Sequence, residues 1–313
     1  FLEIPAAEPP PEVEGGIRVQ ETEETFRIDT GVMRAWFRHT FIEWNNTRNP
    51  DVFFRCEVKA KDGWRDLFRG HPGLFLYMKD QHGLEYNSHS AGPAPKVYLE
   101  ERGPLRTCIR IDGHHATAQG HRFCPYRLRL HFFAGRSDIR IAHTFIFDQE
   151  PRDIELAAVG MKIPLDLGTP LRGAIGGEDQ AHRASNWQEL QVLQEDDRSY
   201  RVSRNSEAFG AGGKAGGWAG LNGERGSVSV AMRDFWQEFP KGFALSREGI
   251  DVQIWPESCG RNLAFTTPFD EPALRFTGKD GNPIRNEKEV ERLLRENPTA
   301  PLNLKSFNIR SLE

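Results

Sequence analysis

The chain has 313 residues, of which 38% are hydrophobic and 27% charged, so it can form a sizeable core and wholesale disorder is not expected. Its formal net charge is −4 with acids and bases well mixed, which argues against a nucleic-acid binder, and no apolar run approaches the ~18–20 residues of a membrane helix. The 30 glycines, 20 prolines and 11% aromatic residues favour many turns and short strands.

Residues 1–95 are predicted to form one β region. After a proline- and glutamate-rich segment at 6–16, runs of β-forming side chains alternate with turn residues such as Asp29-Thr30-Gly31. The predicted strands in this region are Ile17–Val19, Thr25–Ile28, Val32–Phe37, Val52–Val58 and Leu74–Met78.

The middle of the chain has the most regular pattern. Tyr126–Phe133 places aromatic and aliphatic side chains on one face and Arg127, Arg129 and His131 on the other, as an antiparallel sheet with one buried face requires. Turns are predicted at Asp112-Gly113 and at Ala134–Arg136. The other predicted strands here are Val97–Glu100, Arg106–Ile111 and Asp138–Phe147.

Further strands are predicted beyond residue 150, with a long loop-rich stretch at Arg172–Gly226. One helix is predicted at Asn286–Glu296, from its capping asparagine and apolar face. Successive strands with polar turns and so little helix predict an all-β, antiparallel β-sandwich at about 96–275, followed by a linker and short helix at 276–313. The later strands are Glu155–Ile163, Ser227–Ala231 and Val252–Trp255.

Two groups in the middle strands are candidates for function. Arg127 and Arg129, with His131 and Arg140, form either a solvated face with cross-strand partners or a wall that binds anions, because guanidinium groups suit carboxylates. His114 and His115 are either turn residues or proton-transfer groups; a metal site is disfavoured because no acidic partner lies at useful spacing.

A second pair of candidates lies later in the chain. The glycine-rich segment around Lys214 lacks the Ser or Thr of a phosphate loop, so it is either a plain flexible loop or a loop that presents Lys214 and Trp218 to a ligand. The run Ser229–Lys241 leads from a strand to Arg233 and Trp236, whose ring belongs either to the core or to a surface that stacks on sugars.

The four cysteines show no metal-ligand spacing. Cys108 and Cys124 could bridge adjacent strands, but buried free thiols are the favoured interpretation. The sequence also lacks the nucleophile elbow, the HExxH helix and the GxGxxG turn, so serine hydrolases, zincins and dinucleotide enzymes have little support.

Several of these segments resemble the exo-rhamnogalacturonan-lyase-like family of polysaccharide lyases. The resemblance covers roughly residues 17–275 in order, as many short matches. They are ERGPLRTCIRIDGHH from Glu101, YRLRLHFFAG from Tyr126, IRIAHTF from Ile139, GWAGL from Gly217, RDFWQEFPK from Arg233 and Trp255-Pro256.

The resemblance implies an N-terminal β-barrel-like domain, a central supersandwich-like β-sandwich and a C-terminal α/α toroid. Residues 1–95 would be an incomplete first domain, 96–275 the complete sandwich and 276–313 the lead-in to a toroid that is absent. The implied activity is β-elimination on a polysaccharide that contains rhamnose and uronic acid.

β-Elimination removes the C5 proton of a uronate after its carboxylate has been neutralised, and expels the oxygen at C4. We assign neutralisation to Arg127 or Arg233, the base to His115, and the acid to Tyr126 or Lys214. Substrate binding is assigned to Trp218, Trp236, Arg129 and His114. These roles rest on chemistry and placement along the chain.

Two other functions stay open: a carbohydrate-binding or structural β module without chemistry, and a glycoside hydrolase that uses Asp234 and Glu238. The expected partner is a polysaccharide or oligosaccharide, with no nucleic acid and no membrane, in an extracellular or periplasmic location. No cofactor or metal site is assigned, although a requirement for Ca²⁺ is left open, as is the oligomeric state.

Overall fold

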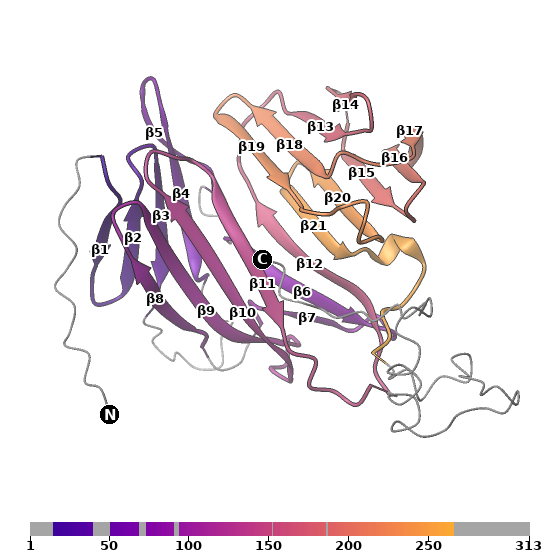
Figure 1. The fold of residues 1–313 in the computed structure, drawn as a ribbon, viewed down its shortest axis with the longest axis horizontal. Helices are drawn as coiled ribbons and strands as arrows, with labels where there is room; N and C mark the ends of the chain where they lie inside the picture. Colours follow the sequence, from indigo (N-terminus) through magenta and orange to yellow (C-terminus); the bar gives the residue numbers. More distant parts are fainter. Residues whose placement is uncertain are drawn as a thin grey trace, which may run out of the picture.

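The computed structural model describes residues 15–39, 51–68, 73–90, 94–151, 153–185 and 187–265. They form three sheets in which every strand pairing is antiparallel, with one short 3-10 helix, η1 (Glu257–Cys259) (Figure 1). The all-β, antiparallel fold class is confirmed. The helix expected at Asn286–Glu296 lies outside the described residues.

The N-terminal strands form a five-stranded sheet in the order β1-β2-β3-β4-β5. In Figure 1 it stands beside β8 (Lys96–Arg102), β9 (Arg106–Ala116) and β10 (Arg122–Phe133). Its path is open, so the barrel-like region expected here is not a closed barrel among the described residues. The strands are β1 (Arg18–Glu21), β2 (Thr25–Asp29), β3 (Met33–Arg38), β4 (Phe53–Ala60) and β5 (Gly63–Asp66).

The largest sheet has twelve strands in the order β11-β10-β9-β7-β6-β12-β21-β20-β15-β16-β17, with β8 paired to β9. The predicted boundary at residue 95 stays a prediction; β6 and β7, which precede it, join the same sheet as β9 and β12, which follow it. The strands are β6 (Phe75–Asp80), β7 (Glu85–Asn87), β8 (Lys96–Arg102), β9 (Arg106–Ala116), β10 (Arg122–Phe133), β11 (Ile139–Phe145), β12 (Leu156–Pro164), β15 (Glu189–Gln194), β16 (Tyr200–Arg204), β17 (Glu207–Gly212), β20 (Lys241–Ser246) and β21 (Gly249–Trp255).

The third sheet has four strands in the order β14-β13-β18-β19 and packs against β20 and β21 through β18. The expectation of a loop-rich stretch at Arg172–Gly226 is therefore wrong, because most of it is strand. Its glycines misled the prediction: at Gly176 the missing side chain makes room for the Trp218 ring. The strands are β13 (Arg172–Gly176), β14 (Ala181–Ala184), β18 (Trp218–Gly223) and β19 (Gly226–Ala231).

The period-two alternation predicted for the middle strands is confirmed. In β10, Tyr126, Leu128, Leu130 and Phe132 are all buried, whereas Arg127 between them is exposed. Phe132 makes a T-shaped contact with the Phe37 ring of the N-terminal sheet, with centroids 5.8 Å apart. The same cluster of buried side chains continues to Leu190 and Phe243 on the far strands.

The turn expected at Asp112-Gly113 is wrong, because both residues lie inside β9. Gly113 pairs with Tyr126 of β10, and a Cβ atom added to it would come within 2.6 Å of the tyrosine ring. This glycine therefore serves the close approach of a ring and not a turn.

All four cysteines are free thiols, which confirms the favoured interpretation, and Cys108 and Cys124 are buried. Among the described residues, no helix has the length and apolar character needed to cross a membrane.

Candidate functional site

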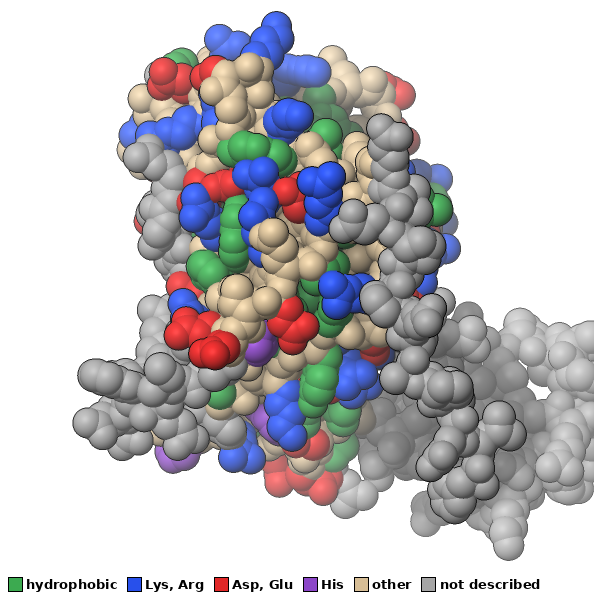
Figure 2. Space-filling view, turned by 90° about the vertical axis from the view of Figure 1, so that its left-hand side faces the viewer, with side chains coloured by type: hydrophobic (Ala, Val, Ile, Leu, Met, Phe, Trp, Pro, Cys, Tyr) green, Lys and Arg blue, Asp and Glu red, His purple; other side chains and the backbone are tan. Residues whose placement is uncertain are grey.

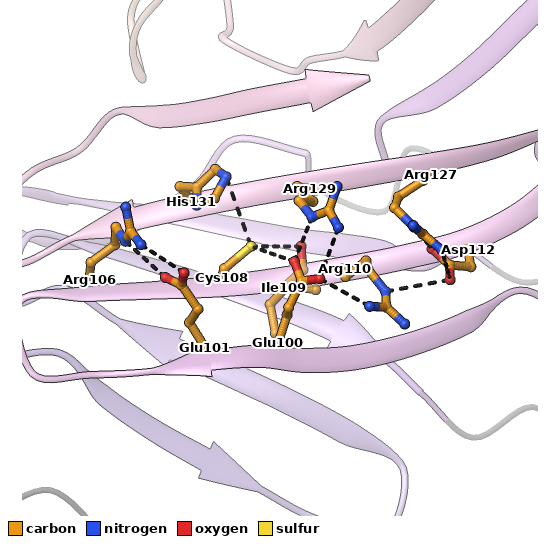
Figure 3. Close-up of polar contacts among 10 residues, drawn as sticks. All are labelled: Glu100, Glu101, Arg106, Cys108, Ile109, Arg110, Asp112, Arg127, Arg129 and His131. Carbon is orange, nitrogen blue, oxygen red and sulfur yellow. Dashed lines mark hydrogen bonds and ion pairs between the residues drawn. The ribbon is translucent and has the colours of Figure 1, made fainter. Parts of the chain in front are cut away.

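The solvent-facing side of β8, β9 and β10 carries a lattice of arginine and carboxylate side chains (Figure 3). Arg127 donates from Nε and Nη2 to the two carboxylate oxygens of Asp112, at 2.8 and 3.0 Å. The two residues are cross-strand partners in the register of β9 and β10. Arg127 is therefore already paired with a carboxylate.

Glu100 is the centre of the same lattice. It accepts hydrogen bonds from Arg129 at 2.6 and 3.0 Å and from Arg110 at 3.0 Å. The hydrogen bonds from Arg129, followed by those from Arg110 and the positive charges of both, outweigh burial and lower the pKa of Glu100 to about 2. Glu100 is thus ionised at any physiological pH and neutralises part of the arginine charge.

One end of the lattice repeats this pairing, since Arg106 donates to Glu101 at 2.7 and 2.8 Å. The Nε2 atom of His131 lies 4.0 Å from the Sγ atom of the buried Cys108. Burial lowers the pKa of His131. On the side of the molecule that faces the viewer in Figure 2, lysine and arginine side chains are interspersed with acidic ones. The lattice matches the first of the two interpretations, a solvated face with cross-strand partners.

His115 and Tyr126 point to the opposite, buried side of the sheet. His115 has no exposed surface, and its Nδ1 lies 2.8 Å from the backbone carbonyl oxygen of Cys124. Its ring centroid lies 5.2 Å from that of Tyr126. Burial lowers the pKa of His115 to about 4 and raises the pKa of Tyr126. In this conformation both groups are neutral at physiological pH and inaccessible to a polymer.

A third group gathers at one edge of the four-stranded sheet, where β17 leads into β18 and β19 leads into a loop before β20. Lys214 is exposed, and its Nζ lies 4.2 Å from the centroid of the half-buried Trp236 ring. Phe235 anchors the loop by stacking on Phe243, with centroids 5.0 Å apart. The loop and the segment before β18 are joined by a hydrogen bond from the Met232 amide to the Gly217 carbonyl oxygen, at 2.9 Å.

Trp218 and Arg233 belong to the same edge. Trp218 opens β18, pairs with Ala231 of β19 and packs on the backbone of Gly176. Arg233 follows β19, and its Nε atom lies 3.3 Å from Oδ2 of Asp234. This ion pair is largely exposed and therefore contributes little to stability. We call Lys214, Trp218, Arg233 and Trp236 the aromatic-cationic edge.

Eight of the nine residues singled out from the sequence thus fall into three places. Four form the aromatic-cationic edge, Arg127 and Arg129 belong to the charged lattice, and His115 and Tyr126 lie in the core behind that lattice. The ninth, His114, is a half-buried residue of β9 opposite Pro125. The three places do not converge on one site, and the catalytic roles of these residues stay predictions.

Sequence reasoning missed Glu100, Asp112 and Arg110, although they pair with the predicted arginines. The signal was present as alternation in β8, whose residues are alternately exposed and half-buried. Only the strand register shows which acid meets which base. Among the described residues, no three histidine, cysteine or acidic side chains are grouped so as to hold a metal ion.

Comparison with known proteins places this sandwich in a family. Residues 17–173 and 176–255 match the family described as the PcRGLX-like protein central beta sandwich domain. The chain therefore belongs to this rhamnogalacturonan-lyase-like family, as the resemblance of its strands implied.

One relative is the uncharacterized protein YetA of Bacillus subtilis (strain 168), which is 21% identical over 79% of this chain. The aligned part makes up 34% of YetA, so the chain spans about a third of the length of that relative.

Proposed function

We propose that the chain is the sandwich module of a polysaccharide lyase that acts on a polymer of rhamnose and uronic acid, and that the aromatic-cationic edge contacts the polymer. Membership of the rhamnogalacturonan-lyase-like family supports the substrate class. The observation that carries the proposal is the position of Lys214, an exposed cation held over the Trp236 ring. Among the described residues, it forms no ion pair with a carboxylate.

The chemistry of β-elimination explains why such a cation matters. The C5 proton of a uronate becomes removable only when the neighbouring carboxylate is neutralised, and a cation without a carboxylate partner can do this at little cost. Arg127 and Arg129 would first have to break bidentate pairs with Asp112 and Glu100. Lys214, which is held over the Trp236 ring, is better suited.

His115 and Tyr126 are left out of this surface because their rings lie in the core. The half-buried rings of Trp218 and Trp236 add flat apolar area, which suits the apolar faces of sugars while their edges stay near water. In this proposal the aromatic-cationic edge binds the polymer and neutralises a uronate carboxylate. It supplies neither the base nor the acid of the elimination.

The test is the binding of rhamnogalacturonan oligosaccharides by this chain, measured by isothermal titration calorimetry. Lys214→Ala and Trp236→Ala are each expected to weaken binding by roughly tenfold, or ~1.4 kcal/mol. The matched control is Trp64→Ala, because Trp64 of the N-terminal sheet also carries a cation, Arg34, 3.8 Å from its ring centroid. Parent-like affinity in both edge variants would refute the proposed surface.

The absorbance of unsaturated uronate in the same mixtures distinguishes the functions. A lyase produces the double bond, a hydrolase releases fragments without it, and a binding module releases nothing. Binding that depends on Lys214, without any product, would show that the chain binds carbohydrate but does not act alone as a lyase.

A further inference from the structure

A cavity of about 260 Å³ lies where the four-stranded sheet meets the twelve-stranded sheet. Its walls come from the segment 165–171 between β12 and β13, from Leu221 of β18 and from Trp187 just before β15. Arg247, in the turn between β20 and β21, also lines it. The cavity therefore belongs to the half of the molecule that carries the aromatic-cationic edge, but it shares no residue with that edge.

The inner wall of the cavity is apolar and firmly held. Leu165, Leu167, Leu221 and Trp187 are each at most 5% exposed and belong to the main core. Hydrogen bonds tie the segment to its surroundings, from the Leu165 amide to the Glu248 carbonyl oxygen at 2.9 Å and from the Arg225 amide to the Leu167 carbonyl oxygen at 2.9 Å. The inner wall of the cavity is therefore held in place by core packing and by backbone hydrogen bonds.

Two residues that line this cavity carry a polar group without a partner among the described residues. The indole Nε1 of Trp187 is buried and makes no hydrogen bond, which is costly for a donor in the core. Arg247 is exposed and makes no hydrogen bond or ion pair with any described residue. The one carboxylate on the wall, Asp166, is paired with Arg225, so its charge is already compensated.

We propose that this cavity binds a small organic carboxylate with an apolar body. The leucine and proline walls take the body, Arg247 pairs with the carboxylate, and an acceptor oxygen of the ligand receives the hydrogen bond of the Trp187 indole. A neutral ligand would leave the arginine unpaired, and a sugar acid would bury several hydroxyl groups against leucine side chains without partners.

The experiment uses this chain with benzoate as the probe, its neutral counterpart benzyl alcohol, and galacturonate. Binding is followed by calorimetry and by the indole N–H resonances in NMR spectra, where the Trp187 signal is identified by its loss in Trp187→Phe. Benzoate is expected to saturate the protein and to shift the Trp187 signal. Benzyl alcohol and galacturonate are each expected to bind at least about tenfold more weakly.

Arg247→Gln is expected to reduce the affinity for benzoate by at least about tenfold, because it removes a charge-assisted hydrogen bond. The matched control is Arg183→Gln, at an exposed arginine of β14 outside the cavity, which should bind as the parent does. Failure of benzoate to saturate the parent, a shift of other indole signals only, or equal binding by Arg247→Gln would each overturn the proposal. The outcome is independent of the oligosaccharide test, since the two surfaces share no residue.

Discussion

His115 and His143 are two buried rings whose centroids lie 6.2 Å apart in the core of the twelve-stranded sheet. Both nitrogens of His143 and Nε2 of His115 lack hydrogen-bond partners among the described residues. Burial, together with the neighbouring histidine, lowers the pKa of His143 to about 3. The His143 ring therefore stays neutral in the folded chain, whereas in the unfolded chain it is protonated near pH 6.5.

This difference predicts a pH dependence of stability. Above pH 6.5 the His143 ring is neutral in both the folded and the unfolded chain, so its burial costs no stability through protonation. Below pH 6.5, His143 is protonated in the unfolded chain but stays neutral in the folded chain. The free energy of unfolding therefore falls with the pH until the pH reaches about 3. His143→Leu is expected to flatten this decline by up to ~1.4 kcal/mol per pH unit, measured by urea unfolding between pH 7 and 4.

The control for that measurement is His121→Gln, at an exposed histidine, which should follow the curve of the parent. A His143→Leu curve parallel to that of the parent would show that the ring is not kept neutral by the fold.

At the scale of the strands, the charged lattice ties β8, β9 and β10 together on the side away from the core. Glu100 of β8 bonds Arg110 of β9 and Arg129 of β10, so one carboxylate spans three strands. Its side chain is 24% exposed, which reduces screening by water. The lattice is therefore best understood as a stabilising feature of this half of the sandwich.

Glu100→Gln is expected to lower the free energy of unfolding by about 1 kcal/mol at pH 7, because an amide cannot replace the charge-assisted pairs. The pKa of Glu100 is lowered in the fold, so its contribution is present above the ordinary value of about 4.5 and is lost as the pH falls through about 2. Chemical unfolding at pH 7 and at acid pH measures both. The exposed Glu207→Gln in β17 is the control, and an equal loss in both variants would contradict the assignment.

At the scale of the whole molecule, one hydrophobic cluster runs from the N-terminal sheet through β9 and β10 to the far strands. Phe37 connects its first part: its ring stacks on Phe53 with centroids 4.7 Å apart and makes a T-shaped contact with Phe132, with centroids 5.8 Å apart. A continuous core couples the sheets, so the described residues are expected to unfold together.

Phe132→Ala is expected to lower the free energy of unfolding by about 3–5 kcal/mol, because a fully buried ring is replaced by a cavity. Tryptophan fluorescence and circular dichroism should still give one coincident transition in urea, at a lower midpoint. Ile146→Ala, at a side chain that is 60% exposed, should barely change the midpoint. Two separate transitions would instead mean that the N-terminal sheet unfolds on its own.

Much of the fold could be predicted because alternation is a local property of the chain. The pattern of Tyr126–Phe133 predicted both the strand and its buried face, since successive side chains of a strand point in opposite directions. Composition misled the prediction where glycines marked close packing, at Gly113 and Gly176, because a glycine needed for a turn and one needed for a ring have the same sequence signature.

The sequence by itself determined the antiparallel strands, the face of each that is buried and, through its motifs, the family. Only the tertiary structure decided which arginines are already paired, because Arg129 meets a carboxylate 29 residues away in the chain. It likewise decided that Lys214 lies over Trp236 and that Trp187 and Arg247 line one cavity. The physical reason is that a strand pattern depends on neighbours two residues apart, whereas pairing and enclosure depend on register between distant strands.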